Sequence, residues 1–203
     1  FGVFWGIFML VALLGGGKGL RELLSAAFSG FANNAGVIIT QNTTKPYEGL
    51  KKGRRWSMTT KDVERVKQQV PEANVVTPML SQWGMNAVYE DNKTSCVLKG
   101  LEKNYQLIEA PQIYYGRYLN DLDNLQKRKV CIMGKKVYKT LFPHGGDPCG
   151  KEIRVGDVFF TVVGVDYSAG KFNINGNSQE AVVVPISVMR DAFAMGDTIH
   201  MLC

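Results

Sequence analysis

The first seventeen residues of the chain contain no charged side chain, and this run limits the folds open to it more than any other feature. Residues 1–17 read FGVFWGIFMLVALLGGG, and Lys18 follows. A helix that crosses the hydrocarbon layer needs about 20 apolar residues, so the run falls slightly short. Because the chain starts with Phe rather than Met, we expect the outer part of a membrane-spanning helix whose first residues were cut away.

Two other interpretations of the run stay open. A secretory signal has a shorter apolar region, about 7–15 residues, and a small-residue cleavage site. Leu14 and the three glycines after it match such a site poorly, and Phe4, Trp5 and Phe8 are bulky for it. The third interpretation is the buried helix of a soluble core. The membrane-spanning helix remains the leading interpretation.

The apolar run continues into an amphipathic segment, residues 18–33. Apolar residues recur there at steps of three and four, which predicts one face of a helix, and Asn33, Asn34 and Gly36 are typical of a helix end. We expect one long helix that leaves the membrane and continues outside it. Its apolar face is our candidate for transmitting movement, and the alternative is that this face is simply core. The face consists of Leu20, Leu23, Leu24, Ala27, Phe28 and Phe31.

The formal charge of +6 is modest for a chain of 203 residues. Its clearest cluster is Lys51, Lys52, Arg54 and Arg55, beside Trp56. A basic patch next to an aromatic ring can indicate nucleic-acid binding, but no strand with interleaved aromatic residues accompanies it. We expect a solvated loop, or a loop near anionic lipid headgroups, and no nucleic-acid partner.

The four cysteines and two histidines do not form a metal or redox motif. Cys96, Cys131, Cys149 and Cys203 contain no C-x-x-C pair, and two scattered histidines are too few for a metal cage. We therefore expect no metal. A disulfide is compatible with an oxidising compartment, and the sequence leaves the pairing open.

One segment nearly matches a nucleotide-binding loop. Residues 145–151, GGDPCGK, satisfy G-x-x-x-x-G-K, but Glu152 stands where Ser or Thr would hold Mg²⁺, and a strand-like segment follows instead of a helix. No G-x-S-x-G occurs either. We expect turn glycines here, no enzymatic site, and no cofactor bound by this chain.

The pattern of elements predicts two parts. The first is a strand–helix–strand unit, with a strand at residues 36–41, an exposed loop at 42–56, a helix at 61–70 and a strand at 73–78. The second is rich in strands and begins with a hairpin, residues 82–89 and 94–101. We expect its further strands at 113–118, 129–133, 151–155, 158–167, 181–185 and 198–203, with short helices at 135–142 and 186–194.

Several segments carry a combined pattern across nearly the whole chain. They are the N-terminal helix, residues 62–78 ending in VPEANVVTP, Gly116-Arg117 followed by the acidic turn Asn120-Asp121, residues 130–142, residues 150–165, and Val184-Pro185-Ile186. No single motif is strong, but their order and spacing together are specific. The chain resembles the MacB-like periplasmic core domain of ABC-transporter permeases of the FtsX-like group, and looks like a Bacteroidetes-type member.

The resemblance implies an α+β fold with a split architecture. A porter-like α/β subdomain follows the long membrane-derived helix, and a strand-rich subdomain is inserted into it. We assign residues 1–17 to the outer part of the first transmembrane helix, 18–80 to the helix continuation and first part of the α/β subdomain, 81–180 to the inserted subdomain, and 181–203 to the return toward the α/β subdomain. The resemblance also implies that a later segment completes that subdomain.

The resemblance implies a non-catalytic role in the inner membrane of a bacterium, with this domain in the periplasm. ATP is hydrolysed by a separate cytoplasmic domain or subunit, and the long helix carries the movement outward to drive efflux. The implied partners are a second permease copy, the ATPase, a periplasmic adaptor and an outer-membrane channel. One alternative is a lipoprotein-releasing permease that binds an acylated protein. An alternative from another class is a membrane-anchored enzyme or ligand-binding domain.

Overall fold

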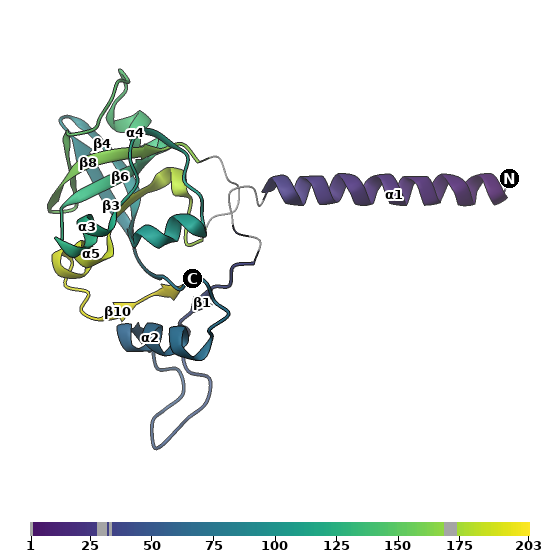
Figure 1. Cartoon of the computed structure of the whole chain (residues 1–203), viewed down its shortest axis with the longest axis horizontal. Coiled ribbons are helices and arrows are strands. Elements are labelled where there is room, and N and C mark those ends of the chain that lie inside the picture. The colour runs from purple at the N-terminus through teal and green to yellow at the C-terminus, as the bar shows by residue number, and fades with distance from the viewer. Residues whose placement is uncertain (1, 28–31, 33, 169–173) are drawn as a thin grey trace.

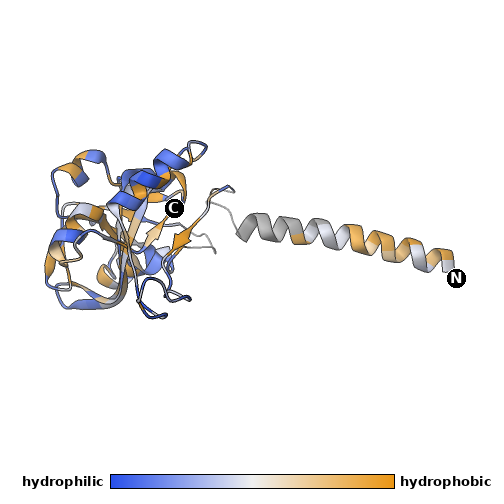
Figure 2. Cartoon of the chain, turned by 90° about the horizontal axis from the view of Figure 1, so that it is seen from below, coloured by the Kyte–Doolittle hydropathy of each residue, from blue (hydrophilic) through white to orange (hydrophobic). Residues whose placement is uncertain are grey.

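The computed structural model describes residues 2–27, 32, 34–168 and 174–203, and only the backbone of residues 18 and 21–27. Helix α1, Gly2–Ala27, projects from a folded body that contains all other described elements (Figure 1). Its first half carries the apolar run (Figure 2), and the large apolar side chains there are exposed. Judged by length and hydropathy together, none of the described helices meets the requirements for crossing a membrane.

In the described residues, nine strands form one sheet. Their order along the sheet is β1 (Ile38–Ile39), β11 (Met201–Leu202), β3 (Pro78–Tyr89), β4 (Asn92–Leu101), β9 (Ala181–Pro185), β6 (Val130–Gly134), β8 (Val158–Asp166) and β5 (Ile113–Gly116), while β7 (Glu152–Val155) pairs with both β3 and β8. That double pairing closes β3, β4, β9, β6, β8 and β7 into a ring. Ring closure removes open strand edges, so most of the strand-rich part is a small barrel.

Short helices pack on the barrel and on the part of the body beside it. They are α2 (Thr60–Gln69), η1 (Lys103–Leu107), α3 (Asp121–Leu125), α4 (Lys135–Leu141), η2 (Ser178–Glu180) and α5 (Ile186–Ala192), and a separate pair of strands joins β2 (Met58–Thr59) to β10 (Thr198–Ile199). Helix α2 begins where the backbone N–H of Thr59 donates to the Asp62 carboxylate (2.9 Å). This bond satisfies one N–H at the start of the helix, as a capping box does.

The core consists of three clusters of buried apolar side chains. The largest includes Leu98, Phe160 and Val182 of the barrel, together with residues of α4 and α5. A second cluster, containing Met79 and Ile108, lies under η1. A third forms beneath α2 and β10. Ala35, in the segment that follows α1, packs against the second cluster, and Ile38 pairs with Leu202 of the third, so these clusters help to set the position of that segment.

Most expected elements are present, with one clear error. The hairpin β3–β4, helix α2 and the strands of the barrel agree with the sequence pattern within a few residues. The strand expected at residues 73–78 is wrong, because β3 starts at Pro78 and residues 73–76 line a groove instead. Ahead of β3, Thr77 exchanges two backbone hydrogen bonds with Cys203 (2.8 and 3.0 Å), while the Ala73 N–H donates back to the Val70 carbonyl (3.1 Å).

Two further outcomes concern the return of the chain and the cysteines. Strand β9 pairs with β4 and β6, and α5 packs on β4. The later part of residues 181–203 lies beside the first unit: the Asp197 carboxylate accepts from the N–H of Thr60 at the start of α2, and β11 pairs with β1. All four cysteines are free thiols, with Cys96 and Cys131 buried. Burial raises the pKa of Cys96 to about 11, so this thiol is poorly reactive at neutral pH.

The loop at residues 42–56 is exposed, as expected, but it has a defined shape. Its backbone closes between Tyr47 and Leu50 (3.2 and 2.9 Å) across Glu48 and Gly49, which both have positive φ. Positive φ at both central residues is the conformation of a tight hairpin turn. The loop is thus a hairpin that projects from the body below α2 (Figure 1).

Candidate functional site

The predicted transmitting face of α1 is described only in part. Leu20 is 60% exposed. Leu23, Leu24 and Ala27 belong to the helix, but their side chains lie outside the described residues, as Phe28 and Phe31 do entirely. The role of this face stays a prediction. What the structure does describe is the place where the chain enters the body after the helix.

The segment after α1 is attached to the end of η1. The backbone N–H of Ala32 donates to the carbonyl of Ile108 (2.8 Å), and Ala35 packs against the cluster that contains Ile108 and Met79. Ala32 is half-buried and Ile108 buried, and a backbone hydrogen bond together with apolar packing fixes a chain more firmly than an exposed contact does. Any displacement of Ala32 therefore acts directly on Ile108.

An apolar groove of about 570 Å³ lies at this junction. Its walls are the entering segment, residues 34–38, the last turn and end of α2 at Val66 and Val70, and residues 72–76. The ends of η1 and β11 complete it with Ile108 and Leu202. The groove thus lies between α2 and the end of η1.

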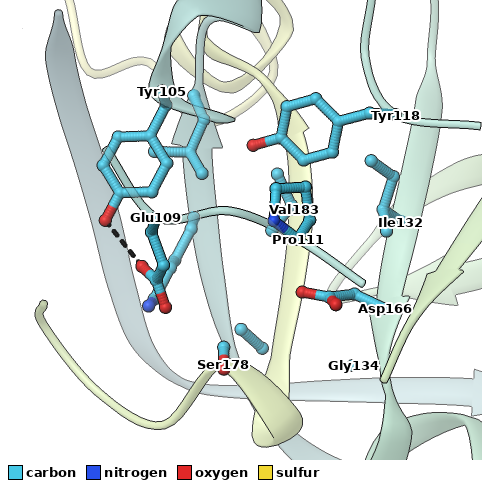
Figure 3. A pocket seen from close by; sticks show the side chains of 12 residues that line it. Tyr105, Glu109, Pro111, Tyr118, Ile132, Gly134, Asp166, Ser178 and Val183 are labelled. Carbon is cyan, nitrogen blue, oxygen red and sulfur yellow. Dashed lines mark hydrogen bonds between the residues drawn. The ribbon is translucent and has the colours of Figure 1, made fainter. Parts of the chain in front are cut away.

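A cluster of polar side chains lines a small cavity that begins at Glu109, the residue after Ile108 (Figure 3). Tyr105, Glu109, Tyr118 and Asp166 surround a cavity of about 30 Å³, the size of one water molecule. The Tyr105 hydroxyl donates to the Glu109 carboxylate (2.8 Å), as the dashed line in Figure 3 marks. Four polar side chains therefore converge on this one cavity.

Lys99 is the ionic centre of this polar cluster. It is only 2% exposed, and its Nζ donates to the carbonyls of Ile174 (3.0 Å) and Gly176 (3.1 Å). Burial lowers the pKa of Lys99 and raises that of Glu109, while the attraction between the two charges opposes both shifts. The ammonium therefore joins β4 to the crossing that leads into β9.

Together these interactions connect the junction to the barrel. Ala32 bonds to Ile108, the charge of the neighbouring Glu109 attracts that of Lys99, and Lys99 bonds to the crossing at Gly176. Hydrogen-bond networks and packed side chains of this kind can carry coupling between distant sites, provided that the elements have two arrangements. The sequence pattern does not reveal Lys99, because a lysine that alternates with inward-facing residues normally faces solvent.

A second ionic site occupies the Gly116-Arg117 segment. The Arg117 guanidinium donates two bonds to the Asp123 carboxylate (2.6 and 3.0 Å), and the Asn120 N–H donates a third (3.0 Å). Asp123 is fully buried. Asp121, the acid of the turn that the sequence singled out, instead meets Lys103 at the surface (2.8 Å), so Asp123 is the partner that the motif had missed.

The pKa of Asp123 records this environment. Burial alone would raise it, but the hydrogen bonds from Arg117 and from the Asn120 N–H, together with the positive charge of Arg117, outweigh burial and lower the pKa. The carboxylate is therefore held in its ionised form and fixes the start of α3 to the end of β5.

The near-match to a phosphate loop is a turn. Strand β7 follows it, as expected, rather than a helix, and the Tyr138 hydroxyl donates to the Gly146 carbonyl (2.6 Å). Among the residues that the structure describes, no group of His, Cys, Asp and Glu is arranged to hold a metal ion.

Comparison with known proteins agrees with this architecture. The family model of the MacB-like periplasmic core domain matches residues 1–202. The macrolide export ATP-binding/permease protein MacB of Bdellovibrio bacteriovorus is 24% identical over 95% of this chain and 29% of its own length. The pyoverdine export ATP-binding/permease protein PvdT of Pseudomonas savastanoi pv. phaseolicola is 27% identical over 92% of this chain and 27% of its own. The chain thus spans less than a third of these relatives.

Solved structures share the fold. The extracellular domain of the noncanonic ABC-type transporter YknZ from Gram-positive bacteria aligns with a TM-score of 0.65 and 21% identity, covering 82% of this chain and 81% of that one. The periplasmic region of MacB from Actinobacillus actinomycetemcomitans aligns with a TM-score of 0.63 and 20% identity, covering 86% and 75%. With its family match over residues 1–202, the chain belongs to the MacB-like periplasmic core domain family of ABC-transporter permeases.

Proposed function

We propose that this chain is the non-catalytic extracytoplasmic domain of a transporter, and that it couples cytoplasmic ATP hydrolysis to a conformational change that drives efflux. Membership of the family supports this proposal, as do the names of two relatives, which export macrolides and pyoverdine. The domain lies in the periplasm, attached to the bacterial inner membrane by α1. ATP binds to a separate cytoplasmic domain or subunit. A second permease copy, a periplasmic adaptor and an outer-membrane channel complete the assembly.

The observation that carries this proposal is the attachment of the segment after α1 to Ile108. Helix α1 has 26 residues, a length of about 39 Å, and an unbroken helix transmits displacement as a rigid body. The hydrogen bond from Ala32 to Ile108 ties the chain that follows the helix to the end of η1, and we infer that displacement reaching Ala32 passes through the polar cluster to the barrel. A packed network at the point where the chain enters the body suits mechanical coupling.

A helix break in α1 tests the coupling. Leu24→Pro removes a backbone donor and costs about 3 kcal/mol of helix stability, so we expect ATP hydrolysis to continue in the full-length transporter while transport falls to background. Both rates are measured on the same proteoliposomes. Leu24→Ala keeps the helix and should retain transport, which controls for loss of the side chain. Normal transport by the proline variant would contradict the proposal.

The apolar groove favours a second candidate, the release of a lipid-modified protein. An acyl chain has the shape and polarity for a groove walled by Val66, Val70 and Leu202. In that case Val37→Asp, which adds a charge to the groove, should abolish release of an acylated protein from proteoliposomes and leave small-molecule efflux unchanged. Equal loss of both activities, or of neither, would contradict this second candidate.

A further inference from the structure

A second large hollow lies on another part of the barrel. It measures about 570 Å³ and is formed where α4 packs beside β4, next to the middle of the β3–β4 hairpin. Its floor is formed by the buried residues Cys96, Val97 and Val137. It shares no lining residue with the apolar groove or with the polar cluster. Neither of the functions proposed above uses this hollow.

One wall of this hollow is an exposed tryptophan. Trp83 is 59% exposed although it lies inside a twelve-residue strand. The pairing of β3 with β4 shifts between Gln82 and Met85, and Gly84 has a φ of +72°. A β-bulge of this kind redirects side chains and is frequent beside functional sites. The bulge therefore presents an aromatic ring to the hollow.

The Trp83 ring is also held in place. A Cβ at Gly176 would stand 2.6 Å from the six-membered ring, and Gly176 has a φ of +96°, so the glycine backbone packs directly on the indole. The carbonyl of this same glycine accepts a bond from the buried Lys99. The ring therefore rests on a fixed backing, which lowers the entropy cost of binding a ligand to its open side.

The rim of the hollow is polar and carries a net positive charge. Lys136 is paired with Glu180 (2.6 Å). Lys139, one turn further along α4, is exposed and forms no ion pair with any described residue. The hydroxyl groups of Thr94 and Ser95 lie on the strand side. The hollow thus combines an aromatic plane, an apolar floor and one unpaired ammonium group.

We propose that this hollow binds a flat, largely apolar small molecule that carries a single negative charge such as a carboxylate. The plane of the ligand stacks on Trp83, and its anion meets Lys139. Stacked aromatic pairs and charge-assisted hydrogen bonds supply the two contacts. A dianion is disfavoured because Glu180 already neutralises Lys136. Binding here is independent of ATP hydrolysis, so its test requires neither transport nor the ATPase.

The test uses 2-naphthoate and the ¹⁵N-labelled full chain in dodecyl maltoside micelles. The chain has three tryptophans, and each indole N–H gives one NMR peak. We expect the Trp83 peak, assigned with Trp83→Phe, to move saturably with a dissociation constant of about 1 mM, a usual efficiency for a ligand of this size. The peaks of Trp56 and Trp5 should stay in place, and Trp5, on α1, also reports entry of the probe into the micelle.

Two comparisons separate this site from general apolar binding. The neutral analogue 2-naphthalenemethanol and the variant Lys139→Met should each weaken binding about threefold or more, while Lys129→Met, at an exposed lysine outside the hollow, should not. The proposal is overturned if the Trp83 peak does not saturate, if all three indole peaks move together, if the neutral analogue binds equally well, or if Lys139→Met has no effect.

Discussion

Arg117→Met is expected to lower the free energy of unfolding by about 3 kcal/mol, because it leaves the buried Asp123 carboxylate without its bidentate partner. The Asn120 N–H still donates to Asp123, and the Arg128 guanidinium lies 3.9 Å from its carboxylate. The loss of stability therefore stays at the lower end of the range for breaking a buried ion pair. Urea unfolding of the full chain, followed by near-UV circular dichroism, measures the difference. A loss below about 1 kcal/mol would contradict the structural role of this pair.

The pH dependence of the same variant is a second readout. In the wild type the pKa of Asp123 is lowered, so its stabilising effect is complete above the ordinary pKa of about 4 and is lost as the pH falls through the lower folded value. In Arg117→Met fewer interactions oppose the effect of burial, so the pKa of Asp123 rises. Protonation of Asp123 at low pH then removes the unpaired buried charge that destabilises the variant. The stability difference should therefore shrink below about pH 4.

Arg65→Met is the matched control for this prediction. Arg65 also pairs with an aspartate, Asp62 (3.5 Å), but this pair is more exposed to solvent. Exposed ion pairs contribute little because water screens them, so we expect a small loss that changes little with pH. Equal losses in Arg65→Met and Arg117→Met would show that burial of Asp123 does not set the size of the effect.

Lys99→Met is expected to cost about 2–3 kcal/mol. The two side chains are similar in volume, but methionine cannot donate, so the carbonyls of Ile174 and Gly176 lose a partner and Glu109 loses its counter-charge. Because Gly176 backs the indole of Trp83, the NMR peak of that indole should also broaden or shift. Thermal unfolding and the indole spectrum together measure both effects.

Two further variants define the origin of the Lys99 effect. Lys93→Met changes an exposed lysine on the same strand and should leave stability within about 0.5 kcal/mol. Adding Glu109→Gln to Lys99→Met removes the uncompensated carboxylate and should recover about 1 kcal/mol. If the double variant is less stable than Lys99→Met alone, attraction between Lys99 and Glu109 is not the source of the loss.

The sequence predicts the local elements better than their partners. The hairpin β3–β4 follows from alternating residues around a turn at Glu90 and Asp91, and α2 follows from Thr59, Asp62 and the valines after them, because these signals act between near neighbours. The parallel pairing of β9 with β4 joins residues more than 80 positions apart. No local pattern encodes that choice, so the barrel cannot be derived from periodicity alone.

The polar part of the candidate site escapes prediction for a related reason. Leu98 and Cys96 face the barrel interior, and Lys99 faces outward, as alternation demands. Segments from elsewhere in the chain, η1 and the crossing at Ile174 among them, cover that outward face and bury Lys99. Asp123 is hidden in another way, since Asp121 is equally acidic and two residues away. The fold decides which carboxylate meets Arg117.

The closed ring of strands has a consequence for how this domain changes shape. A ring without open edges resists deformation, whereas β11 joins it to β1 through two residue pairs, at Pro78 and Met79. In the described part of the sheet, β3 alone bridges the two sides. The barrel should therefore swing as a solid unit about a pivot at Pro78 and Met79, and snapshots of the transport cycle should differ in the angle at that pivot while the barrel itself superimposes.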